Sequence, residues 1–213
     1  MLVSISTMPA GEQYLKYAKE IENFVDFLHL DVCDGEYNST RCFLPEYAQK
    51  INQNSTIPMD CHLMTKKPLL FAKEYIKAGV NIITAQIEAF ETDKQIEEFI
   101  SYVKNHNTLV GISLEPNTDV RRILPYLDKL DIVLIMSVQT GKSGQEFNKI
   151  VLSKIEYLAK LKVNYNYSYK IEVDGGITDK TADLVKQAGA EIVVSGNYVF
   201  QSKNCQERIK KLK

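Results

Sequence analysis

Two hydrophobic periodicities alternate along this chain. Runs such as IVLIMSV (132–138) and EIVVSG (191–196) are apolar almost throughout, which is typical of parallel strands that helices cover. Between such runs, apolar residues recur three and four positions apart, as at Leu15, Ala18 and Ile21. That spacing predicts amphipathic helices. The chain therefore alternates strand and helix from one end to the other.

Eight strand–helix units can be placed in the 213 residues. The predicted strands are 2–6, 26–32, 57–64, 81–88, 108–114, 131–138, 169–175 and 190–196. The predicted helices are about 11–23, 43–51, 68–79, 92–105, 118–130, 147–162 and 178–189, with a last helix near the C-terminus. Alternation predicts a parallel α/β fold, and eight units favour a closed (β/α)8 TIM barrel spanning residues 1–213 as a single domain. A doubly wound open sheet is the alternative, but it normally uses fewer units, and no GxGxxG follows the first strand.

Composition excludes several classes of function. The net charge is −1, which gives no footprint for nucleic acid. The sequence has no apolar run of about 18 residues and no signal-peptide pattern at its N-terminus. Its four cysteines, Cys33, Cys42, Cys61 and Cys205, form no CxxC pair. We therefore expect a cytoplasmic protein whose thiols stay reduced.

Polar residues gather at the ends of three predicted strands. His29 and Asp31 end the second strand, Asp60 and His62 the third, and Asp174 the seventh. Side chains two residues apart on a strand share a face, and in a barrel the carboxyl ends of the strands meet at one mouth. Such groups either satisfy one another in the core or share a substrate or a metal. As ligands they would suit Zn, Fe, Mn or Co.

Glycine-rich segments follow the last three strands. They are TGKSGQ (140–145), DGG (174–176) and SGN (195–197). Loops at this position of a barrel often bind phosphate through backbone N–H groups. A single glycine-rich turn can be a simple connection, but three on successive strands favour an anion site.

Several segments resemble the ribulose-phosphate 3-epimerase family, in order and over essentially the whole chain. They are HLDVCDG, MDCHLM, GISLEPNT, DIVLIMSV with GQEF, EVDGGI and GAEIVVSGNYVF. Allulose-6-phosphate 3-epimerase has similar motifs. The resemblance implies a divalent metal held by His29, Asp31, His62 and Asp174, and an acid/base pair formed by Asp31 and Asp174. The substrate-binding residues that it implies are Ser4, His62, Met136, Gly144, Gly175, Gly176, Gly196 and Asn197.

We therefore expect a metal-dependent 3-epimerase that interconverts ribulose 5-phosphate and xylulose 5-phosphate. In this scheme two carboxylates transfer the proton, and the metal stabilises an enediolate. The resemblance also favours a homo-oligomer, with a sugar phosphate as the only other partner. The alternatives are the six-carbon allulose 6-phosphate, a relative that binds a sugar phosphate without turning it over, and a metal-dependent hydrolase, which usually needs more histidines.

Some positions depart from the family pattern. Cys33 stands where a methionine is usual, Gln86 where a histidine is common, and Asn197 where a serine is usual. The segments EYNST (36–40) and TGKSGQ, with Lys142, differ as well. Lys142 could add a contact to phosphate. No proposed metal ligand or acid/base carboxylate is lost. The changes bear on the length and affinity of the substrate, and the segments EYNST and TGKSGQ motivate the alternative of a relative that binds without turnover.

Overall fold

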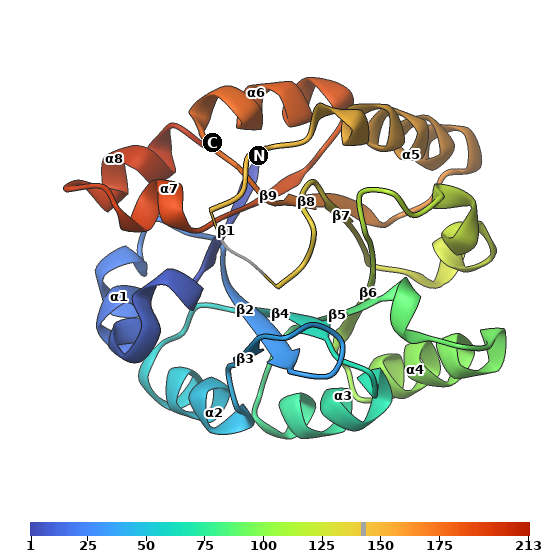
Figure 1. Ribbon diagram of the computed structural model, residues 1–213, viewed down its shortest axis with the longest axis horizontal. Coiled ribbons are helices and arrows are strands. Elements are labelled where there is room, and N and C mark those ends of the chain that lie inside the picture. The colour runs from blue at the N-terminus through green and yellow to red at the C-terminus, as the bar shows by residue number, and fades with distance from the viewer. Residues whose placement is uncertain (142–143) are drawn as a thin grey trace.

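Eight parallel strands close into a barrel in the computed structural model, which describes residues 1–141 and 144–213. The first strand pairs with both the second and the last, so the sheet has no open edge (Figure 1). The barrel strands are β1 (Leu2–Ser6), β2 (Phe27–Asp34), β4 (Met59–Met64), β5 (Ile82–Gln86), β6 (Leu109–Leu114), β7 (Ile132–Met136), β8 (Lys170–Asp174) and β9 (Ile192–Ser195). The predicted TIM barrel is confirmed, and the doubly wound sheet is excluded.

Helices surround the barrel and bury their apolar faces against the outside of the sheet (Figure 1). The α-helices are α1 (Tyr14–Ile21), α2 (Pro45–Asn54), α3 (Pro68–Lys77), α4 (Asp93–Asn105), α5 (Leu152–Tyr165), α6 (Asp179–Ala188), α7 (Asn197–Phe200) and α8 (Cys205–Lys210). Short 3-10 segments are η1 (Met8–Gln13), η2 (Ile87–Ala89), η3 (Val120–Lys129) and η4 (Lys149–Val151). Within the described residues, no helix has the length and apolarity needed to cross a bilayer.

Two local predictions were wrong. The segment 118–130 was expected to be an α-helix, but residues Val120–Lys129 form 3-10 turns. Pro125 lies inside the segment, and its missing N–H and its ring prevent a regular α-helix there. The sequence analysis also missed β3 (Arg41–Cys42), which pairs antiparallel with the end of β2. A two-residue strand has too little periodicity to detect.

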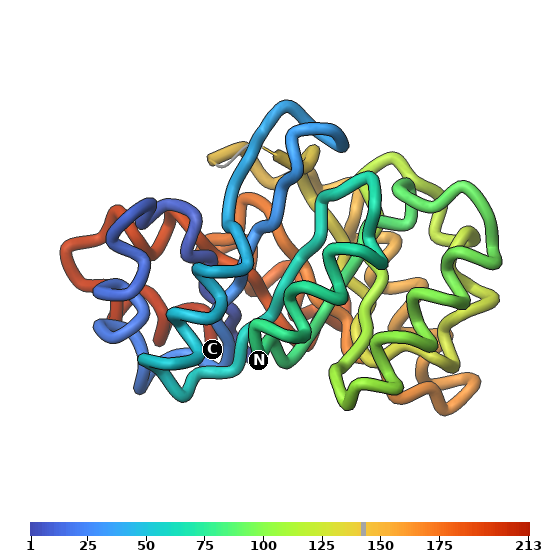
Figure 2. Tube along the Cα trace, turned by 90° about the horizontal axis from the view of Figure 1, so that it is seen from below, coloured from blue at the N-terminus to red at the C-terminus, as the bar shows by residue number. Residues whose placement is uncertain are grey.

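The β2–β3 hairpin rises above one end of the barrel (Figure 2). The loop after β7 rises at the same end, and the Thr40 hydroxyl donates a hydrogen bond of 2.7 Å to the carbonyl of Gly141 in that loop. The strands point their carboxyl ends toward this end, so the hairpin and the loop form the rim of the barrel mouth. We use the name "rim" for residues 34–42 and 139–141.

Candidate active site

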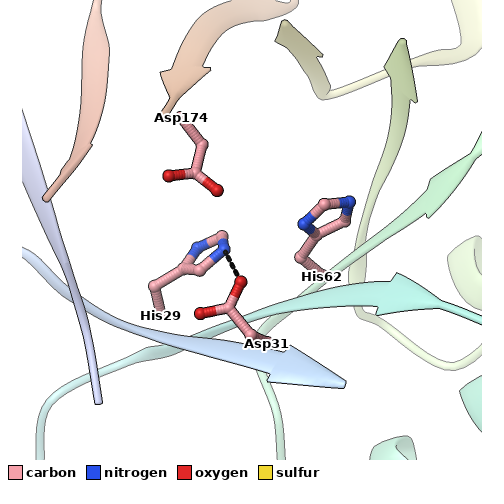
Figure 3. A group of neighbouring side chains, drawn as sticks. All are labelled: His29, Asp31, His62 and Asp174. Carbon is pink, nitrogen blue, oxygen red and sulfur yellow. Dashed lines mark ion pairs between the residues drawn. The ribbon is translucent and has the colours of Figure 1, made fainter. Parts of the chain in front are cut away.

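Four polar side chains meet inside the mouth (Figure 3). His29 and Asp31 extend from β2, His62 from β4 and Asp174 from β8. One donor atom from each lies within 4.8 Å of the others. The period of two along a strand places His29 and Asp31 on the same inner face. The structure thus brings together the four residues that the family resemblance implied as metal ligands.

Residues beneath the cluster set the orientation of the His29 imidazole. Its Nδ1 lies 2.7 Å from Asp60 Oδ2, and the Ser4 hydroxyl donates to the same oxygen at 3.0 Å. The imidazole therefore turns its Nε2 toward the cluster, 3.7 Å from Asp31 Oδ1. A carboxylate that accepts from the far nitrogen of a histidine is the arrangement that orients histidine ligands in metal sites.

Asp31 is held by a separate contact. The Ser6 hydroxyl donates to Asp31 Oδ2 at 2.7 Å, and the Met8 N–H donates to the Ser6 oxygen at 3.2 Å. These bonds engage only one carboxylate oxygen of Asp31. The other oxygen faces His29 and the centre of the cluster.

Burial and mutual charge shift the pKa values of the cluster strongly. Burial, then the neighbouring Asp31 carboxylate, raises the pKa of Asp174 to about 7. Burial, then the charge of His29, lowers the pKa of His62 to about 3, so His62 is neutral. Burial acts to lower the pKa of His29, but the Asp60 and Asp31 carboxylates outweigh it and raise that pKa well above its usual range. Without a metal, His29 and Asp174 therefore tend to hold protons, and a bound cation can replace these protons.

The donor set fits a divalent metal. In the described part of the chain, His29 Nε2 and His62 Nδ1 are buried and have no hydrogen-bond partner. A buried polar atom without a hydrogen-bond partner destabilises the fold. A bound metal ion would give each of these two nitrogens a partner. Two imidazoles with two carboxylates suit Zn, Fe, Mn or Co, and the ligand types do not choose among them.

A cavity of about 270 Å³ opens above the cluster. Its lining includes these residues that the sequence analysis singled out: Asp31, Met136, Gly144, Asp174, Gly175, Gly176, Gly196 and Asn197. His29 and His62 are buried beneath it. Ser4 is also fully buried and contacts Asp60, so the structure places it a layer below the mouth. Lys142 lies outside the described residues.

The loop after β8 requires its two glycines. Gly175 has φ +107° and Gly176 has φ +60°, conformations that L side chains rarely adopt. A Cβ on Gly176 would lie 2.4 Å from the backbone nitrogen of Phe147. This close approach packs the loop after β8 against the end of the loop after β7, and both loops line the cavity. Such turns expose backbone N–H groups that can receive an anion.

Sequence reasoning gave no role to Ser6 or Glu172, and it named Asp60 only as one of the polar groups at the strand ends. Ser6 lines the cavity beside Asp31, while Asp60 and Glu172 are buried under the ligands. Burial and the Asp60 carboxylate raise the pKa of Glu172 well above its usual range, so Glu172 is a neutral acid. The signal was present in the sequence. Asp60 and Glu172 each stand two residues before a proposed ligand, on the same face of the strand.

Comparison with known proteins identifies the family of this chain. The family model described as "Ribulose-phosphate 3 epimerase family" matches residues 3–200. A ribulose-phosphate 3-epimerase of Helicobacter pylori (strain ATCC 700392 / 26695) is 37% identical over 206 residues, covering 96% of this chain and 93% of the relative. One from Schizosaccharomyces pombe is 37% identical over 191 residues, covering 88% and 81%.

Solved structures resemble the fold at lower identity. A crystal structure of 3-hexulose-6-phosphate synthase superposes with a TM-score of 0.73 at 21% identity and covers 100% of this chain and 98% of its own. That likeness concerns the fold alone. The family match and the relatives in sequence go further: this chain belongs to the ribulose-phosphate 3 epimerase family, which is a family of isomerases.

Proposed function

We propose that the protein is a metal-dependent 3-epimerase that interconverts D-ribulose 5-phosphate and D-xylulose 5-phosphate. One observation carries the proposal: Asp31 and Asp174 stand on β2 and β8, and both face one cavity above a buried group of metal-ligand type. Epimerisation next to a ketone removes a proton from one face of a carbon and returns a proton to the other. Two carboxylates on different strands can serve the two faces.

The two carboxylates differ in their surroundings. Asp31 accepts a hydrogen bond from Ser6, whereas burial and the neighbouring Asp31 carboxylate raise the pKa of Asp174 to about 7. Without the metal, Asp174 can therefore hold or release a proton near neutral pH. One carboxylate takes the proton from C3 and the other, in its acid form, delivers a proton to the opposite face. For the reverse reaction they exchange roles.

His29, Asp31, His62 and Asp174 would hold the divalent ion. When bound, the ion supplies a Lewis acid that stabilises negative charge on the sugar oxygens next to the reacting carbon. Met64 and Met136 line the cavity and limit the access of water to that carbon. The glycine loops after β7, β8 and β9 would bind the phosphate, which supplies binding energy away from the reacting carbon.

The remaining expectations follow from the same proposal. The ligand is a sugar phosphate, and residues 1–213 act as one domain within a homo-oligomer. We place the protein in the cytoplasm, where a reducing environment would maintain Cys33, Cys42, Cys61 and Cys205 as the free thiols found in the structure.

The test is proton NMR of the metal-reconstituted protein with ribulose 5-phosphate in D₂O. Deuterium at C3, appearing together with xylulose 5-phosphate, is the expected result. The absence of both exchange and product with an active metal would overturn the five-carbon assignment. A parallel reaction with allulose 6-phosphate tests the second candidate, because the sequence departs from the family pattern at residues 36–40, in the rim, and at residues 140–145.

A further inference from the structure

Three sulfur atoms form a layer directly above the proposed metal ligands. Cys33 lies two residues beyond Asp31 on β2, and Met64 lies two residues beyond His62 on β4, so each faces the same way as the ligand before it. Cys33 is the direct register partner of Met64 on one side and of Cys42 on the other. The β2–β3 hairpin thus completes a row of two thiols and one thioether.

The contacts within this row are close. Cys33 Sγ lies 3.9 Å from Met64 Sδ. Two sulfur ligands at about 2.3 Å from one ion, with an angle of about 120° between them, are about 4.0 Å apart. Residues paired directly across antiparallel strands have Cβ atoms about 4.5–5.5 Å apart, so Cys42 stands within reach of the same point. The Cys42 thiol donates a hydrogen bond of 2.8 Å to the carbonyl of Asp31, on the same strand as Cys33.

The surroundings of the row suit a bound cation. The Asn38 side-chain amide lies over both atoms, with Nδ2 3.8 Å from Cys33 Sγ and 3.9 Å from Met64 Sδ. An amide donor at this position stabilises a thiolate. Met64 lines the cavity and Cys42 is only half-buried, so an ion can reach the row from the mouth.

We propose that Cys33, Cys42 and Met64 form a second metal site, selective for a soft monovalent ion of the Cu(I) class. Thiolate and thioether ligands select Cu(I), whereas the imidazole and carboxylate cluster below suits borderline divalent ions. On binding, the two thiols release their protons to solvent and no electron is exchanged. The ion ties β3 to β4 across the end of β2 and narrows the mouth of the cavity, so its occupation inhibits turnover.

The test is an anaerobic competition titration of the divalent-metal-loaded full chain, with Cu(I) supplied as its bathocuproine disulfonate complex. We expect the chain to withdraw one Cu(I). Cys33→Ser and Cys42→Ser should each weaken the affinity by at least about 100-fold, more than the loss typical of a changed second shell. Met64→Leu, which keeps the apolar volume, should weaken it less.

Matched controls are Cys61→Ser and Cys205→Ser. Cys61 lies on β4 with its side chain toward the helices, and Cys205 begins α8. Both controls should keep the wild-type affinity for Cu(I). Equal losses in the controls, or unchanged affinity in Cys33→Ser and Cys42→Ser, would overturn the proposal.

X-ray absorption at the copper edge identifies the ligand atoms of the ion in the wild-type protein, so it does not require that any variant folds. Sulfur neighbours at about 2.3 Å support the site, and a shell of nitrogen or oxygen would place the ion at the histidine cluster and contradict it. Cu(I) should also inhibit the wild type but not Cys42→Ser. Because binding is measured without turnover, failure of this proposal can be distinguished from failure of the proposed epimerase activity.

Discussion

The cluster inside the mouth and the rim above it are built in different ways. The cluster stands on β2, β4 and β8, where ladder hydrogen bonds on both sides hold each strand in register. The rim consists of the tip of the β2–β3 hairpin and the loop after β7, joined by side-chain contacts such as that from Thr40 to Gly141. In the proposed reaction, the groups that hold one geometry stand on strands, and the groups that would meet the rest of the substrate stand on loops. The type of reaction is therefore easier to infer from this chain than the length of the sugar.

The strongest test of the strand-borne cluster is Asp174→Asn. Asparagine keeps the shape of the neutral acid but can neither accept the proton from carbon nor deliver one. We expect turnover to fall by about 1,000-fold or more, within the range of lost general acid–base catalysis. Coupled-enzyme kinetics measure it. The control is Asp183→Asn, a change at an exposed position on α6, which should leave turnover unchanged. Comparable activity in Asp174→Asn would contradict its proposed role.

Asp60→Asn tests whether the layer below the ligands positions them. The change removes the charge that faces His29 Nδ1 and leaves a side chain of the same shape. We expect metal affinity to fall by about 10–100-fold, measured by competition with a chromophoric chelator. Ser4→Ala removes only a neutral bond to Asp60 and should cost much less. If both variants bind metal like the wild type, His29 does not depend on this layer.

The cluster should also respond to pH. The pKa of Asp174 is raised to about 7, above the usual range of an aspartate, so the metal-free protein holds that proton below about pH 7. A metal must displace this proton and also that of His29, whose pKa is raised well above its usual range. The metal affinity should therefore fall as the pH decreases, by about tenfold per unit for each proton released. His62, with a pKa of about 3, contributes no such proton. Titration calorimetry in buffers of different ionisation heat counts the released protons.

Gly176→Ala tests the loops that line the other side of the cavity. The new Cβ would meet the Phe147 nitrogen, at a backbone φ of +60°. We expect a loss of about 1–3 kcal/mol in stability and a KM raised more than kcat is lowered. Gly11→Ala is a matched control, because φ is +51° there but nothing lies within 4 Å of the new Cβ. Thermal unfolding compares the two variants, and equal losses would show that the contact with Phe147 is unimportant.

Thr40→Val should have the smallest effect. It removes the hydrogen bond to Gly141 that joins the two loops of the rim, worth about 1 kcal/mol. We expect KM for the sugar phosphate to rise by less than about tenfold, with kcat and metal content unchanged. Steady-state kinetics beside the exposed control Ser39→Ala measure this. A large loss in kcat would mean that the rim also shapes the cluster.

The contrast between strands and loops also explains which parts of the structure could be predicted from the sequence. The barrel strands were located to within a few residues, because apolar parallel strands and amphipathic helices leave strong periodic patterns. The pairing of β3 with β2 was not predicted, because the partner of Cys42 depends on the path of a loop. Asp60 and Glu172 were overlooked as supporting groups, because their role depends on which carboxylates become neighbours across the barrel. The place of Ser4 below the mouth depends in the same way on its contact with Asp60.

The closure of the barrel has a consequence for the newly made chain. β1 leaves the ribosome well before its partner β9 does, with Leu2 paired to Ile192. Pairings this distant in sequence form late and slowly. The histidines of β2 and β4 therefore emerge well before Asp174 does, and for that interval the nascent barrel is an open sheet with two unpaired edges. Until β9 is synthesised, those unpaired edges are exposed to pairing with other chains.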